Sequence, residues 1–266
     1  MSANNARVLF EQGSHKCLVY DNLVTGEGIG SNQFVLIDSG HMAVLDPGGE
    51  LTYTPLTIEL SRILDISKLD YVFASHQDPD IITSLPRWLI HSPCRVVTSK
   101  LWARFLPHLA SSFQTSRMQA DVSSRLIEVP DAGMRLPFGA GEIVVLPAHF
   151  LHSVGNLQFY DPLSRILFSG DMGASVGGAP GEVKDFDRHI PLMEGFHRRY
   201  MASKKICRLW ANMIRTLDVA MIVPQHGGHF AGENVQRFLD WISALDCGID
   251  LLEQANYRVP GRSALR

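Results

Sequence analysis

Short apolar runs separated by polar turns predict the strands of this chain. Phe34–Ile37 and Met42–Leu45 flank Asp38-Ser39-Gly40, a pattern that predicts a β-hairpin. Further short runs rich in β-branched and aromatic residues predict strands at Tyr71–Ala74, Arg95–Thr98, Glu142–Leu146, Leu157–Tyr160, Ile166–Ser169 and Ala220–Val223.

Apolar residues spaced by three and four positions predict the helices. The first predicted helix contains Leu56–Leu64, and the second covers Ile81–Ile90, with Pro86 in its first turn or at a break. The longest predicted helix covers Met193–Leu217, and the last one covers Val235–Leu245. Strands are followed by helices twice along the chain, which predicts two packed sheets with helices outside them.

The chain contains no linker rich in Pro, Gly or Ser, so we expect a single domain over residues 1–266. The glycine-rich stretch Gly173–Gly181 has neither a strand nor a helix pattern and is predicted to be a loop. Long loops in compact domains are often functional.

Composition narrows the function classes. The chain is 45% hydrophobic and 19% charged, with a net charge of −3 and scattered basic residues, which argues against a nucleic-acid partner. No apolar run approaches the roughly 18 residues of a membrane span, and the first residues lack a secretory pattern. The four cysteines are far apart in the sequence. We therefore expect a reduced, cytoplasmic protein without a membrane partner.

The strongest chemical signal follows the predicted strand Tyr71–Ala74. His76, Asp78 and Asp80 alternate in the sequence, so in an extended chain they lie on one face. Histidine and aspartate are metal-ligand types, and this pattern predicts half of a metal site. The alternative is an Asp-rich turn in which Asp80 caps a helix.

Three later strands also end in histidine or aspartate. His149 and His152 follow one strand, Asp171 follows the next, and His226 follows the strand Ala220–Val223. Because α/β architectures place their sites at such strand ends, we expect these side chains to meet.

The motif order HxDxD, His, GD and QHG resembles the metallo-β-lactamase superfamily. Within it, the chain is most similar to the flavodiiron proteins, whose motif is HxExD, and to their stand-alone branch, the oxygen-binding diiron proteins. The resemblance implies an α/β fold, an αββα four-layer sandwich of the metallo-β-lactamase type, with a two-metal site between the sheet edges. It also implies the ligands of both metals: His76, Asp78, His152 and Asp171 for the first, and Asp80, Asp171 and His226 for the second.

The chain departs from the family pattern in two ways. Ile81 stands where the family has a histidine ligand, so the second metal lacks one side chain. His149 is either a replacement ligand or a histidine outside the ligand set, and the second interpretation is favoured. His189, His197 and Tyr200 lie either near the site or on an ordinary helix face. The chain also lacks a recognisable flavodoxin part, so no FMN is expected on it.

Three imidazoles and three carboxylates without a thiolate suit iron or manganese, although zinc also accepts carboxylates. Our first hypothesis is therefore a non-haem protein with two iron ions that binds or reduces O2 or NO. It would act as an oxygen sensor or carrier with a signalling partner, or as a reductase with an external electron donor of the rubredoxin or flavoprotein type. The alternative is a dinuclear zinc hydrolase, in which a metal lowers the pKa of bound water. The sequence leaves open whether the protein is an enzyme and whether it is a homodimer.

Overall fold

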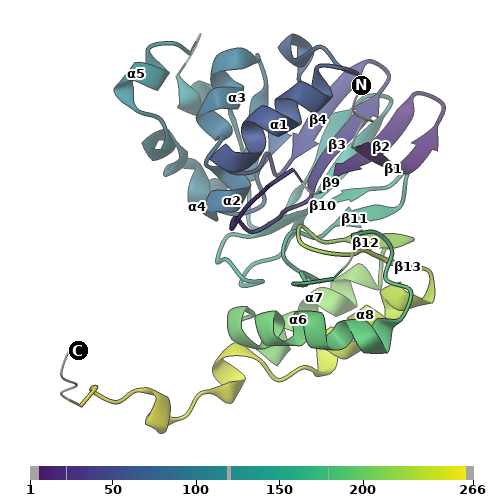
Figure 1. Cartoon of the computed structure of the whole chain (residues 1–266), viewed down its shortest axis with the longest axis vertical. Helices are drawn as coiled ribbons and strands as arrows, with labels where there is room; N and C mark the ends of the chain where they lie inside the picture. Colours follow the sequence, from purple (N-terminus) through teal and green to yellow (C-terminus); the bar gives the residue numbers. More distant parts are fainter. Residues whose placement is uncertain (1–5, 22, 119–120, 179, 262–266) are drawn as a thin grey trace.

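Two β-sheets pack face to face, and helices cover the outer face of each (Figure 1). This computed structural model describes residues 6–21, 23–118, 121–178 and 180–261. Helices α1–α5 lie on one side of the sheets, and helices α6–α8 lie on the other (Figure 1). This arrangement confirms the predicted four-layer αββα sandwich.

The first sheet has its strands in sequence order. Strands β1 to β4 pair antiparallel, and strands β4 to β7 pair parallel. Its strands are β1 (Ala6–Gln12), β2 (His15–Tyr20), β3 (Gln33–Asp38), β4 (His41–Leu45), β5 (Tyr71–Phe73), β6 (Arg95–Ser99) and β7 (Leu126–Val129).

The second sheet has the order β13-β12-β11-β10-β9-β8. Its pairs are antiparallel except for β11 and β12, which run parallel. Its strands are β8 (Met134–Phe138), β9 (Gly141–Pro147), β10 (Leu157–Asp161), β11 (Ile166–Phe168), β12 (Met221–Val223) and β13 (Phe230–Ala231).

The helices fall into two groups that match the two outer layers. The first group is α1 (Glu50–Leu60), α2 (Pro79–Ile82), α3 (Leu85–His91), α4 (Lys100–Ala103) and α5 (Ser112–Thr115). The second group is α6 (Phe186–Tyr200), α7 (Lys204–Ile214) and α8 (Glu233–Ala244). Among the described residues, no helix is both long and apolar enough to span a bilayer.

Three apolar clusters separate the four layers. One lies under α1–α3, one lies under α6–α8, and the third fills the space between the sheets. In the third cluster, aromatic rings from the two sheets meet: Phe34 contacts Phe168 with ring centroids 5.0 Å apart, and Phe73 contacts Phe159 at 4.9 Å. Burial of these rings removes large apolar areas from water and holds the sheets together.

The predicted long helix Met193–Leu217 was wrong, because the chain forms two helices there. Helix α6 ends at Tyr200 with Met201 in extended conformation, and Ser203 begins α7 by accepting a hydrogen bond from the Ile206 N–H. The apolar spacing continues across this break and hides it. The predicted helix Ile81–Ile90 is likewise divided into α2 and α3, and Pro86 lies in the first turn of α3, where proline is tolerated.

The predicted strands are all present, and each of their ends lies within one residue of the predicted position. Strands β1, β2, β7, β8 and β13 were not predicted. The loop prediction for Gly173–Gly181 holds for the described residues, which exclude residue 179.

The strand directions create two edges with different roles. Strands β5, β9, β11 and β12 all run toward one edge, which we call the histidine edge. At the other edge of the sandwich, which we call the hairpin edge, strand β2 begins and strand β10 ends. The predicted site residues all follow strands that end at the histidine edge.

Candidate metal centre

His76, Asp78 and Asp80 leave the end of β5 and enter the short helix α2. Asp78 is the residue before the first helical position, but its side chain makes no capping hydrogen bond. Asp80, which the alternative interpretation expected to be the cap, lies within the first turn. Neither carboxylate caps the N-terminus of the helix, so both are available to a ligand.

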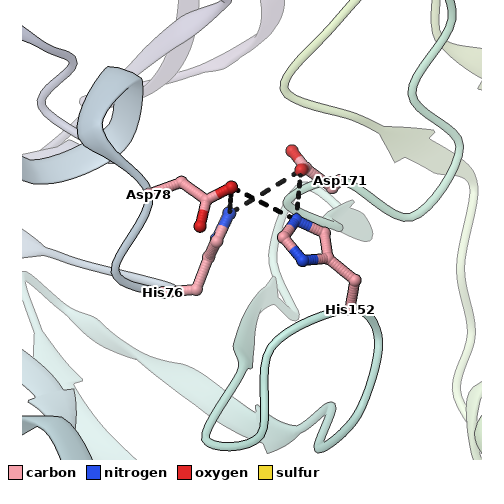
Figure 2. Close-up of side chains that lie close together, drawn as sticks. All are labelled: His76, Asp78, His152 and Asp171. Carbon is pink, nitrogen blue, oxygen red and sulfur yellow. Dashed lines mark hydrogen bonds and ion pairs between the residues drawn. The ribbon is translucent and has the colours of Figure 1, made fainter. Parts of the chain in front are cut away.

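The first half of the candidate centre is a tight group of four side chains. His76, Asp78, His152 and Asp171 each offer one atom, and these atoms lie within 4.8 Å of one another (Figure 2). The His152 Nε2 atom lies 2.9 Å from Oδ2 of Asp171 and 3.4 Å from Oδ2 of Asp78. The His76 Nε2 atom lies 3.6 Å and 3.7 Å from the same two carboxylate oxygens.

The second half is built on the other oxygen of Asp171. The His226 Nε2 atom lies 3.5 Å from Asp171 Oδ1 and 3.3 Å from Asp80 Oδ2. Asp171 thus presents Oδ2 to one pair of histidines and Oδ1 to the third histidine. The structure brings together all six residues that the resemblance implied, and a carboxylate in this position can bridge two metal ions.

The hydrogen bonds around these histidines leave their Nε2 atoms directed at the centre. His226 donates from Nδ1 to the carbonyl oxygen of Gly30 over 2.8 Å, so its Nε2 lone pair is free. His76 uses Nδ1 to contact the Ser75 hydroxyl at 2.9 Å. Orientation of the second ring nitrogen is typical of metal-ligating histidines.

Two buried polar atoms in the centre, Nε2 of His76 and Oδ1 of Asp171, have no hydrogen-bond partner among the described residues. Buried polar atoms are nearly always satisfied, so an unpartnered one calls for an explanation, and a bound ion is one such explanation. The orphaned atoms and the mixed imidazole and carboxylate donors therefore fit a pair of divalent metal ions.

The electrostatics of the centre favour a cation. Burial opposes ionisation of Asp171, but the hydrogen bond from His152 and the positive charges of His76 and His226 outweigh it and hold its pKa well below the usual range. Burial also lowers the pKa of His76, but Asp171 and Asp78 more than compensate and raise it to about 10. A proton on His76 therefore occupies the place that a metal ion would take.

The structure places His149 and Ile81 away from this role. The His149 Nε2 atom lies 2.8 Å from the carbonyl oxygen of Asp131. The Ile81 side chain is fully buried in the apolar cluster under α1–α3. No replacement for the missing family histidine is therefore found at either position.

Sequence reasoning did not single out Asp46 as a site residue. Its Oδ1 accepts a hydrogen bond from the Ser75 N–H at 2.8 Å, next to His76, and burial raises its pKa to about 6. Its place directly after the apolar strand β4 is the same signal that identified the other site residues, and it could have pointed to Asp46.

Helix α6 supplies three further contacts to the centre. The His152 ring packs edge-on against Tyr200, with centroids 5.5 Å apart, and against Phe196 at 6.0 Å. The buried Nε2 atom of His197 accepts a hydrogen bond from the Gly173 N–H, two residues after Asp171. For His197 and Tyr200, a location near the site is thus correct.

A cavity of about 400 Å³ lies beside the second half of the centre. Its walls include His226 and two glycine-containing segments, residues 28–32 and 175–178. The glycine-rich loop therefore lines the cavity through which a small molecule can reach His226.

With this geometry in place, comparison with known proteins identifies the family. The family described as ODP family beta lactamase matches residues 29–227. The chain belongs to this family.

Solved structures of the chemotaxis sensor ODP are similar to this ODP-family chain over almost its whole length. A peroxy diiron species of that sensor has 38% sequence identity and a TM-score of 0.83, covering 94% of this chain and 99% of that one. The apo state from T. denticola has 38% identity and a TM-score of 0.81, covering 94% and 98%.

Two relatives connect the ODP-family chain with flavoproteins. A putative diflavin flavoprotein from Synechocystis sp. is 34% identical over 214 residues, which cover 75% of this chain and 32% of that protein. The metal-soaked flavodiiron core from Synechocystis sp. has 18% identity and a TM-score of 0.72, covering 90% of this chain and 61% of that one, and shows the shared fold. The chain spans between about a third and about half of the length of the curated relatives it matches.

Proposed function

We propose that this chain is a non-haem diiron protein that binds O2 and serves as an oxygen-sensing module. The observation that carries the proposal is the shared carboxylate Asp171, whose two oxygens face two separate sets of ligands. The similarity to the sensor ODP, solved as a peroxy diiron species and covered almost completely, supports the same assignment.

In this proposal, His76, Asp78 and His152 would hold the first iron, Asp80 and His226 would hold the second, and Asp171 would be shared by both. The iron pair would supply the electrons that reduce O2 or hold it in a bound form. Carboxylates and imidazoles without thiolate suit iron better than a sulfur-rich set would.

The protein's own residues prepare the centre. Ser75 and the carbonyl oxygen of Gly30 orient the rings of His76 and His226. The rings of Phe196 and Tyr200 cover one side of His152 and reduce the access of water to it. Asp46 and His197 fix the backbone next to His76 and Asp171 through single hydrogen bonds.

A sensing role is supported by the chemotaxis sensor ODP, which is 38% identical to this chain and is matched over 99% of its own length. A reductase would need an external electron donor, of the rubredoxin or flavoprotein type, and would turn over repeatedly. A sensor would respond once and pass its state to a signalling partner. The two roles therefore differ in turnover, which can be measured.

The test is metal analysis of protein purified without oxygen, followed by optical spectra during exposure to O2 and, separately, to NO. We expect about two irons per chain and a new absorption band with O2. Loss of the band when O2 is removed indicates binding, and its persistence indicates oxidation. Two zinc ions and an unchanged spectrum after iron-rich expression would overturn the proposal in favour of the hydrolase. Continuous O2 consumption with a reduced rubredoxin would instead identify a reductase.

A further inference from the structure

A second group of metal-ligating side chains lies at the hairpin edge, at the other end of the sandwich from the proposed iron centre. His15 and Cys17 come from strand β2 of the first sheet, and Asp161 ends strand β10 of the second sheet. All three side chains are buried, with exposed fractions of 3%, 0% and 1%. Each offers one ligand atom, and the three atoms lie within 4.8 Å of one another.

The three atoms differ in chemistry and are closely spaced. The Cys17 Sγ atom lies 3.6 Å from His15 Nε2 and 3.4 Å from Asp161 Oδ2. The His15 Nε2 atom lies 2.7 Å from the same carboxylate oxygen. The group thus combines one sulfur, one nitrogen and one oxygen donor, whereas the centre at the histidine edge has no sulfur.

These separations are close to the edges of a zinc tetrahedron. With Zn–S near 2.3 Å and Zn–N or Zn–O near 2.0 to 2.1 Å, tetrahedral angles place sulfur about 3.6 Å from nitrogen or oxygen. The same geometry places nitrogen about 3.3 Å from oxygen. The two distances from sulfur therefore already match, and the imidazole and carboxylate need to separate by about 0.6 Å.

The far side of the His15 ring supports a ligand role. Its Nδ1 atom is buried without a hydrogen-bond partner in the part of the chain that the structure describes, and Oδ1 of Asp38 lies 3.9 Å from it. Asp38 is held in place by the N–H of Ala140 and the hydroxyl of Ser14. Metal-bound imidazoles usually donate their other ring N–H to a carboxylate, and Asp38 is the carboxylate on this side of the ring, although 3.9 Å is longer than a hydrogen bond.

Charge balance also favours a divalent cation here. Burial and the charge of Asp161 raise the pKa of the Cys17 thiol, so this sulfur is not an exposed redox-active thiolate. A bound metal ion deprotonates a coordinating thiol. One thiolate, one carboxylate and one neutral imidazole then neutralise a charge of +2 inside the protein.

A cavity of about 450 Å³ touches the group, with His15, Asp38 and Asp161 in its wall. It gives a cation a route to the site and gives water room for the fourth ligand position. We propose that His15, Cys17 and Asp161 form a mononuclear zinc site that links the two sheets at the hairpin edge. This proposal does not rest on the proposed function of the iron centre.

Cobalt(II) is the probe, because a thiolate bound to cobalt gives a charge-transfer band in the near ultraviolet. The proposed iron ligands contain no sulfur, so this band reports the Cys17 site even if cobalt also enters the iron centre. We expect the full chain, freed of metal, to develop the band. At saturation, the intensity of the band should correspond to one cobalt–thiolate bond per chain. Cys17→Ser should abolish the band, while Cys94→Ser, at another buried cysteine, should keep it.

A folded wild-type chain without the band would overturn the proposal, and so would a band that survives Cys17→Ser. A band that disappears with Cys207→Ser, whose sulfur lies 3.8 Å from that of Cys247, would also overturn it. If near-ultraviolet circular dichroism shows that Cys17→Ser does not fold, His15→Gln decides the question. It should weaken the cobalt affinity by at least tenfold, and an unchanged affinity would reject the site.

Discussion

The two halves of the proposed iron centre are unequally equipped. The first half has His76, Asp78 and His152 besides the shared Asp171, and all four ligand atoms lie within 4.8 Å of one another. The second half has Asp80 and His226, and Ile81, the residue after Asp80 in the sequence, occupies the position where the family pattern has a histidine. We infer that a metal ion in the second half would depend more strongly on the shared Asp171 than a metal ion in the first half. The second half would also have more room for an external ligand.

We expect the largest effect from substitution of Asp171, the residue that both halves share. Asp171→Asn keeps the shape of the side chain but removes the charge that both halves share, so we expect the iron content to fall from about two to well below one per chain. The measurement is iron per folded chain after anaerobic loading and gel filtration. Asp187→Asn, on the exposed partner of Arg237, is the matched control and should keep both irons. Two retained irons in Asp171→Asn would show that this residue does not bridge.

The inequality itself is tested by removing one histidine from each half. His226→Ala should leave about one iron per chain, because the first half keeps all four of its residues. His76→Ala should leave less than one, because it removes a ligand from the stronger half and leaves only the weaker one. His149→Ala should leave the iron content unchanged, since that ring contacts the Asp131 carbonyl oxygen instead. Equal losses in the two ligand variants would contradict the inequality.

The loop that carries the shared Asp171 is held by His197, which must be neutral to accept the hydrogen bond from the Gly173 N–H. Burial lowers the pKa of His197 to about 4, whereas the unfolded chain has a value near 6.5. As the pH falls from 6.5 to 4, the unfolded chain therefore gains a proton that the folded chain does not, and stability decreases over this window. The loss from this residue is on the order of 3 kcal/mol.

Urea unfolding of metal-free protein at pH 7 and pH 4 measures this loss. The wild type should lose about 3 kcal/mol more than His197→Gln, which cannot titrate in this range but can still accept the Gly173 hydrogen bond. Equal losses would mean that His197 is not kept neutral by the fold. Asp46, whose pKa is raised to about 6, shifts both proteins alike and cancels in the difference.

We expect the smallest effect from substitution of Ile81, which tests whether this side chain acts only as part of the core. This side chain is buried in the core, so Ile81→Val should lower the free energy of unfolding by about 0.5–1.5 kcal/mol and leave the iron content unchanged. Thermal unfolding and metal analysis together measure both quantities. Ile58→Val, at a position that is 52% exposed, should change stability by less than about 0.5 kcal/mol. A changed iron content in Ile81→Val would indicate that this side chain also lines the centre.

Much of the histidine edge could be predicted from the sequence because its information is local. Each of His76, Asp171 and His226 lies three residues after the last residue of a strand, and the end of a strand is visible without knowing its partners. The break between α6 and α7 could not be seen, because the apolar spacing continues through Met201–Ser203.

The hairpin edge was beyond sequence reasoning for a different reason. His15 and Asp161 are 146 positions apart, on strands that belong to different sheets. Their contact depends on how the two sheets pack, and the strand β2 that carries His15 was not predicted. His197 is similar, because its partner Gly173 lies on a loop whose path is set by tertiary structure.

The proposed iron ligands are far apart in the sequence. His76 follows a strand of the first sheet, and His226 follows a strand of the second sheet. In polymer terms, a metal ion that holds these ends together closes a loop of roughly 150 residues, and restricting an unfolded chain in that way is worth on the order of 5 kcal/mol. The iron pair would thus act as a reversible cross-link as well as a reactive group. We therefore expect the iron-free chain to be digested faster by proteases, so that the lifetime of the protein follows its iron supply.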